Sequence, residues 1–83
     1  MFKIILTARA KRELRNISKR HQFAIASVIE ELKDNPFAGK PLTRELTGRY
    51  ALRVGIYRII YTVNKSDKTI YILTAGHRSV VYN

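Results

Sequence analysis

The feature of this sequence that most constrains its fold is a pair of strand-like segments, IYRIIYTV at 56–63 and TIYILTA at 69–75, joined by the turn NKSDK. Both segments are rich in β-branched and aromatic residues, which favour strands. In the first segment one face carries Tyr57, Ile59, Tyr61 and Val63, and the other carries Arg58, Ile60 and Thr62. Asn64, Ser66 and Asp67 are turn formers, so the two segments are predicted to form a β-hairpin.

More strands are expected around this hairpin. RYALRV at 49–54 reads as a strand that ends at Gly55, just before the hairpin. Gly76 interrupts the last strand, which predicts a β-bulge or a close approach of the backbone at that point. The segment SVVY at 79–82 is a candidate for a short further strand.

The N-terminal part predicts one strand and two helices. FKIIL at 2–6 reads as a strand, and Thr7 is placed to cap a helix with Ala10, Leu14 and Ile17 on one face. After a short break, a second helix is expected to bury Phe23, Ile25, Val28, Ile29 and Leu32. It stops before Pro36, and a loop follows up to Gly48. The order β-α-α-β-β-β predicts the α+β class, with a helical hairpin packed on one sheet.

Composition narrows the function classes. The chain has 83 residues, so one domain spanning 1–83 is expected. It has no cysteine, which excludes disulfides and thiolate metal sites. No apolar segment at the N-terminus is long enough for a signal peptide or a membrane span, so a cytoplasmic protein without membrane contact is expected. The net charge of +10 favours a polyanionic partner, and arginine in particular suits phosphate.

The available side chains also limit the chemistry. The six carboxylates are scattered and show no metal-ligand spacing, so no metal site is expected. A nuclease of this composition would use Arg, Lys, Tyr and His without a metal. His21 lies among charged residues at the start of a helix and is expected on the surface. His77, beside Arg78 at a strand end, is open to a catalytic, an RNA-contacting or a structural role.

Two patterns in the sequence are specific, LRVGxYRxIY at 52–61 and GHRxxVY at 76–82. Together with TARAKRELRNI and LKDNPFAGKPLTREL, they resemble RelE-type toxins of the RelE/ParE superfamily over nearly the whole chain. The resemblance implies a twisted, mostly antiparallel sheet, here of four to five strands. It also implies a toxin of a type II toxin–antitoxin system that cleaves messenger RNA in the ribosomal A site. In this family the 2′-hydroxyl is the nucleophile, and no metal or cofactor is used.

The resemblance assigns roles to individual residues. Arg58 matches the family arginine that stabilises the transition-state phosphate. Arg78 matches a second arginine at the scissile phosphate, with the role of proton donor or charge stabiliser. Tyr82 matches the C-terminal tyrosine that stacks on, or orients, the splayed base. Four other cations are expected to bind RNA: Lys40, Arg44, Arg49 and Arg53.

One stretch departs from the family pattern. Well-studied members carry lysines just ahead of the LR strand, with leaving-group or general-base roles, whereas this chain reads GRYALR there. Arginine cannot serve as an ordinary base because it keeps its proton. The base is therefore missing, supplied by the ribosome, or provided by His77, since imidazole titrates near neutral pH.

Two other functions stay open on the sequence alone. A ParE-type toxin would share the fold and inhibit DNA gyrase without cutting RNA, although the GHRxxVY ending favours the RelE type. The third function is a nucleic-acid-binding module of weak catalytic activity. Both toxin types imply an acidic, partly disordered, RelB-like antitoxin over the basic face. The ribosome and messenger RNA are the other expected partners, and operator DNA is expected to be contacted only through the antitoxin.

Overall fold

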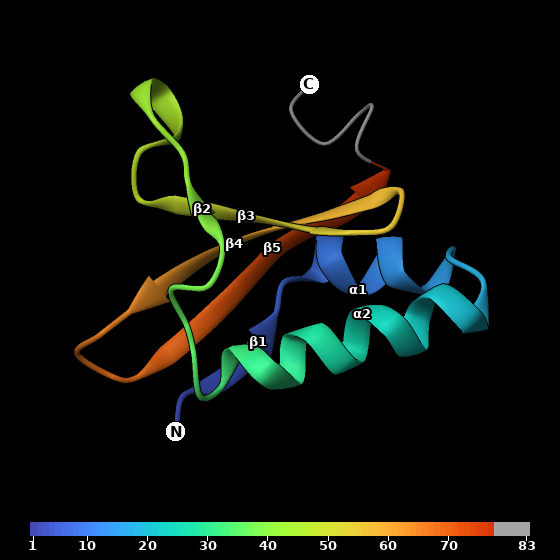
Figure 1. The fold of residues 1–83 in the computed structure, drawn as a ribbon, viewed down its shortest axis with the longest axis horizontal. Coiled ribbons are helices and arrows are strands. Elements are labelled where there is room, and N and C mark those ends of the chain that lie inside the picture. Colours follow the sequence, from blue (N-terminus) through green and yellow to red (C-terminus); the bar gives the residue numbers. More distant parts are fainter. Residues whose placement is uncertain (78–83) are drawn as a thin grey trace.

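The computed structural model describes residues 1–77 and places two helices against one face of a five-stranded sheet (Figure 1). The helices are α1 (Ala8–Arg15) and α2 (Lys19–Leu32), and a 3₁₀ turn, η1, covers Arg44–Leu46. The strands are β1 (Lys3–Leu6), β2 (Lys40–Pro41), β3 (Arg49–Val54), β4 (Tyr57–Asn64) and β5 (Thr69–His77). Their order is β1-β5-β4-β3-β2; β1 runs parallel to β5, and the other neighbours are antiparallel. The predicted α+β class and mostly antiparallel sheet are confirmed.

The β4–β5 hairpin forms as predicted. The side-chain Oδ1 of Asn64 accepts hydrogen bonds from the backbone N–H groups of Ser66 and Asp67, at 3.0 and 3.3 Å. A second hairpin joins β3 to β4 through the two residues Gly55 and Ile56. Gly55 has φ +61°, a conformation that residues with a Cβ rarely adopt, so this tight turn depends on glycine.

The irregularity in β5 lies at Leu73, so the bulge predicted at Gly76 is wrong. The pairing register shifts between residues 60 and 61 of β4 and leaves Leu73 as the extra residue of β5. Gly76 pairs in regular register with Arg58. The extra residue contacts the cap of α1, because the Thr7 hydroxyl donates to the Leu73 carbonyl at 3.0 Å. The glycine could not reveal this long-range contact.

The helices form as predicted, with one error on α2. Thr7 caps α1, and its hydroxyl accepts a hydrogen bond from the Ala10 N–H at 3.1 Å. The core is made by Ala10, Ile17, Ile25, Ile29 and Leu32 from the helical hairpin, with Ile59, Tyr61, Ile70, Ile72 and Ala75 from β4 and β5. Phe23, expected in this core, is 74% exposed. It precedes Ile25 by two residues, which is a rotation of about 200° around the helix.

The predicted loop from Pro36 to Gly48 contains one short strand. Lys40 and Pro41 pair with Ala51 and Tyr50 as β2, the edge of the sheet. Proline is tolerated there because an edge strand does not need every backbone donor. None of the helices in residues 1–77 is long and apolar enough to cross a membrane. The candidate strand SVVY falls outside the described residues.

Candidate active site

The sheet face opposite the helices carries a pocket of about 290 Å³. Five described residues line it: Lys40, Leu42, Ala51, Arg53 and Arg58. The core-facing side chains of β4, such as Tyr57 and Ile59, point to the helices, so Arg58 between them belongs to the other face. Three of the predicted site residues, one each from β2, β3 and β4, therefore meet in one cationic pocket.

Arg53 and Arg58 are the charged centre of this pocket. They are direct partners in the β3–β4 ladder, because the two-residue turn at Gly55 fixes the register of the hairpin. Like charges placed directly opposite each other destabilise a sheet. Two arginine side chains that line one pocket from paired positions suit an anion with several oxygens, such as a phosphodiester.

Lys40 is held at the pocket by the residue before it. The Gly39 N–H donates a hydrogen bond to the Tyr61 hydroxyl at 2.9 Å, and Tyr61 is fully buried in the core. A Cβ on Gly39 would lie 2.7 Å from the Tyr61 hydroxyl oxygen and 2.9 Å from the Ala51 carbonyl oxygen. Only glycine fits such a close approach. The contact of Gly39 with Tyr61 therefore fixes the backbone of β2, including Lys40, against β3. Burial raises the pKa of Tyr61, which keeps its hydroxyl protonated.

His77 lies on the opposite side of the sheet from Arg58. It pairs with Tyr57 across the strands, and Tyr57 packs against the helix-covered core. The ring centroids of His77 and Tyr57 are 6.2 Å apart, and those of Tyr57 and His21 are 5.2 Å apart. The Nδ1 of His21 is also 2.8 Å from the Ser18 hydroxyl. The structure thus groups both histidines around Tyr57 and does not bring His77 to the Arg53–Arg58 pocket.

The other predicted site residues lie in three places. Arg49 is exposed at the start of β3, on the face of Arg53 but four residues away, which is about 13 Å along a strand. Arg44 is exposed in η1, with φ +58°, on the turn that projects away from the helices (Figure 1). Arg78 and Tyr82 fall outside the described residues.

Comparisons with known proteins decide the family. Residues 4–82 match the family described as the ParE toxin of the type II toxin–antitoxin system parDE. Toxin RelG of Mycobacterium tuberculosis is 34% identical over 86 residues, which cover 98% of this chain and 95% of that protein. Toxin RelE of the same organism is 30% identical, over 98% of this chain and 86% of that protein. This chain is a RelE-type toxin of the RelE/ParE superfamily.

The structural comparison agrees with this membership. The crystal structure of the toxin–antitoxin complex RelBE2 from M. tuberculosis contains a chain that matches this toxin with a TM-score of 0.86. The two are 33% identical, and the match covers 93% of this chain and 98% of that one. The likeness therefore extends over nearly the whole fold.

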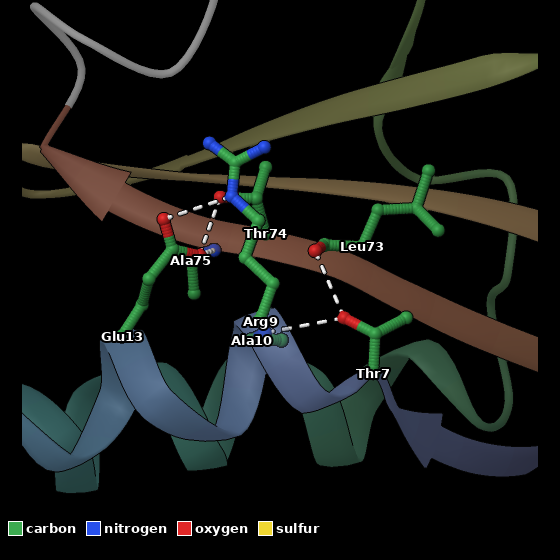
Figure 2. A network of polar contacts seen from close by, with 7 residues as sticks. All are labelled: Thr7, Arg9, Ala10, Glu13, Leu73, Thr74 and Ala75. Atoms are coloured by element: carbon green, nitrogen blue, oxygen red, sulfur yellow. Dashed lines mark hydrogen bonds and ion pairs between the residues drawn. The ribbon is translucent and has the colours of Figure 1, made fainter.

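One residue that the sequence did not single out, Glu13, fixes strand β5 of this RelE-type toxin. Figure 2 shows Glu13 reaching from α1 to the end of β5. Its Oε1 accepts hydrogen bonds from the Thr74 hydroxyl at 2.5 Å and from the Ala75 N–H at 3.0 Å. Its Oε2 lies 3.3 Å from the Arg9 Nε. With Thr7 at the Leu73 carbonyl, α1 thus holds the bulged part of β5, three residues ahead of Arg78 in the chain.

The environment of Glu13 keeps it ionised. Burial raises the pKa of Glu13, but the hydrogen bonds from Thr74 and Ala75 and the charge of Arg9 outweigh burial, so its pKa is lowered overall. In the sequence, the spacing of Arg9 and Glu13 indicates only an ordinary i,i+4 ion pair on a helix. Nothing local signals a partner 61 residues away.

Proposed function

We propose that this toxin is a metal-free endoribonuclease that cuts messenger RNA in the ribosomal A site and so inhibits translation. The observation that carries the proposal is the pocket in which Lys40, Arg53 and Arg58 meet from three strands. The RelE-type names of its relatives also support it.

The proposed reaction is an attack of the 2′-oxygen on the adjacent phosphorus, which breaks the bond to the 5′-oxygen. The products are a 2′,3′-cyclic phosphate and a 5′-hydroxyl end. Negative charge builds on the non-bridging oxygens in the transition state, and Arg58 stabilises it with a preorganised guanidinium. We assign to Arg78 the second charge at this phosphate and to Tyr82 the stacked base, since bases of unpaired RNA are commonly held on aromatic rings.

The other cations are proposed to hold the RNA backbone. Arg49 lies on the same sheet face as Arg53, and Arg44 is exposed on η1, so both can contact phosphates that flank the cut. Lys40 and Arg53 line the pocket itself. We give His77 a structural role beside Tyr57, because its ring lies on the helix-covered side of the sheet.

We propose a RelB-like antitoxin as the partner that silences the toxin. The matched M. tuberculosis structure is a toxin–antitoxin complex. A net charge of +10 calls for an acidic partner segment that covers the sheet face with the pocket.

Incubation of the purified toxin with ribosomes that translate a defined message tests the proposal. Mapping of the 5′ ends of the fragments should show cuts at the codon in the A site, and these cuts should vanish with Arg58→Ala. Arg12→Ala, at an exposed arginine of α1, removes the same charge away from the pocket and should leave the cuts in place. An intact message together with cleaved DNA trapped on gyrase would contradict the proposal and favour the ParE-type function.

A further inference from the structure

The three cations of the pocket differ in their ability to release a proton, which proton transfer requires. Arginine side chains keep their proton under all conditions in which proteins work, so Arg53 and Arg58 can bind charge but cannot exchange a proton. A lysine ammonium is also charged at neutral pH, yet it can give up its proton and recover it. Among the described residues that line the pocket, only Lys40 can therefore act in proton transfer.

The other titratable groups of the described chain lie elsewhere. His21 and His77 are gathered around Tyr57 on the helix-covered side of the sheet. Glu13 is engaged by Thr74 and Ala75 beside α1. No described carboxylate lines the pocket.

Lys40 is also placed by a built element rather than by a flexible loop. It pairs with Ala51 across β2 and β3, and both residues line the pocket. The hydrogen bond from the Gly39 N–H to the buried Tyr61 hydroxyl fixes the backbone one residue earlier. These contacts fix the backbone from which the Lys40 side chain extends, and a fixed attachment point favours the positioning that general acid–base catalysis requires.

We infer that Lys40 is the general acid of the cleavage step, an inference that rests on the proposed ribonuclease function. The 2′-oxygen attacks phosphorus while its proton passes to water. The bond between phosphorus and the 5′-oxygen breaks with its electron pair on oxygen, and the Lys40 ammonium gives this oxygen its proton. The neutral amine then recovers a proton from water.

The test compares two messages that differ in one atom at the cleaved bond, an ordinary 5′-oxygen and a bridging 5′-sulfur. A thiolate leaves without a proton, so it does not need a general acid. On the ordinary message, Lys40→Gln should slow single-turnover cleavage on the ribosome by about 10²–10⁴-fold. On the sulfur message, the cleavage rate of Lys40→Gln should lie within about tenfold of the rate of the unchanged toxin.

Three further variants separate proton transfer from charge and from folding. Lys40→Arg keeps the charge but not a transferable proton, so it should be nearly as slow as Lys40→Gln on the ordinary message. Arg58→Ala should stay slow on both messages, because sulfur does not replace charge stabilisation. Lys11→Gln, at an exposed lysine of α1, should cleave like the unchanged toxin.

The outcomes distinguish the general-acid role of Lys40 from the ribonuclease function on which it rests. If Lys40→Arg retains full activity, or if Lys40→Gln is equally slow on both messages, Lys40 acts only through its charge and the general-acid role is overturned. If the unchanged toxin leaves both messages intact, the ribonuclease function itself is contradicted, and the role of Lys40 falls with it.

Discussion

Arg53 and Arg58 lie directly opposite each other in the β3–β4 ladder, and both side chains line the same pocket on one side of the sheet. A sheet optimised for stability would not pair like charges in this way. The proposed function accounts for this pairing, because an anionic ligand in the pocket would offset the repulsion between the two arginines, and functional sites commonly carry such a cost in stability.

The first prediction is that Arg53→Gln stabilises the free toxin and weakens its activity. Removing one of two facing charges should raise the free energy of unfolding by roughly 0.2–1 kcal/mol. Urea unfolding followed by circular dichroism measures this change. Arg49→Gln is the matched control, because Arg49 pairs with Thr62 and its loss relieves no like-charge contact in the ladder. Equal stabilisation by both variants would show that only net charge matters.

The second prediction concerns the anchor of β2. Tyr61→Phe removes the acceptor of the Gly39 N–H and leaves that donor unsatisfied in a buried place. The free energy of unfolding should fall by about 1–3 kcal/mol. Tyr71→Phe is the control, since the half-buried Tyr71 makes no hydrogen bond through its hydroxyl within residues 1–77. No difference between the two variants in denaturant unfolding would exclude the anchoring role of Tyr61.

The third prediction is a pH dependence that comes from Glu13. Its pKa in the folded chain lies below the ordinary value of 4.5, so its carboxylate contributes stability above that value. This contribution is lost as the pH falls through the lowered pKa. The difference in free energy of unfolding between the unchanged toxin and Glu13→Gln should therefore shrink as the pH falls through 4.5 and on through the lowered pKa. A difference that stays constant over this range would contradict the ionised contact, and Glu45→Gln on η1 serves as the exposed control.

The fourth prediction is that RNA binding is strongly dependent on salt. Each phosphate that a cation neutralises on a single strand adds about 0.7 to the slope of log affinity against log salt concentration. Arg53→Gln should reduce the slope by about this amount for a single-stranded oligonucleotide. Arg12→Gln on α1 should leave it unchanged. The pocket is not the phosphate-binding surface if both variants keep the slope of the unchanged toxin.

The parts of the fold that could be predicted are those set by local pattern. The β4–β5 hairpin follows from alternation and from Asn64, which ends β4 and accepts hydrogen bonds from the turn. The helix α1 begins at Ala8, directly after Thr7, whose hydroxyl caps it. The strand β2 could not be predicted, because two residues carry no periodicity and tertiary contacts hold them. The bulge at Leu73 could not be predicted either, because its contact with Thr7 joins residues far apart in the sequence.

The candidate site was predictable only in part. Alternation along β4 separates Arg58 from the core, and the short turn at Gly55 then brings Arg53 opposite it. The side of the sheet on which His77 lies depends on the β4–β5 register, which the bulge changes by one residue. The contact of Glu13 with Thr74 joins residues 61 positions apart, so no local sequence pattern predicts it.

The most direct measurement of the proposed function is the single-turnover rate of message cleavage on programmed ribosomes at saturating toxin. Arg58→Ala should cleave about 10²–10³-fold more slowly than the unchanged toxin, the typical loss when one preorganised transition-state contact is removed. Ribosome binding, measured by co-sedimentation, should remain. Equal cleavage rates for the two proteins would contradict the assignment of the Arg53–Arg58 pocket as the site that cuts RNA.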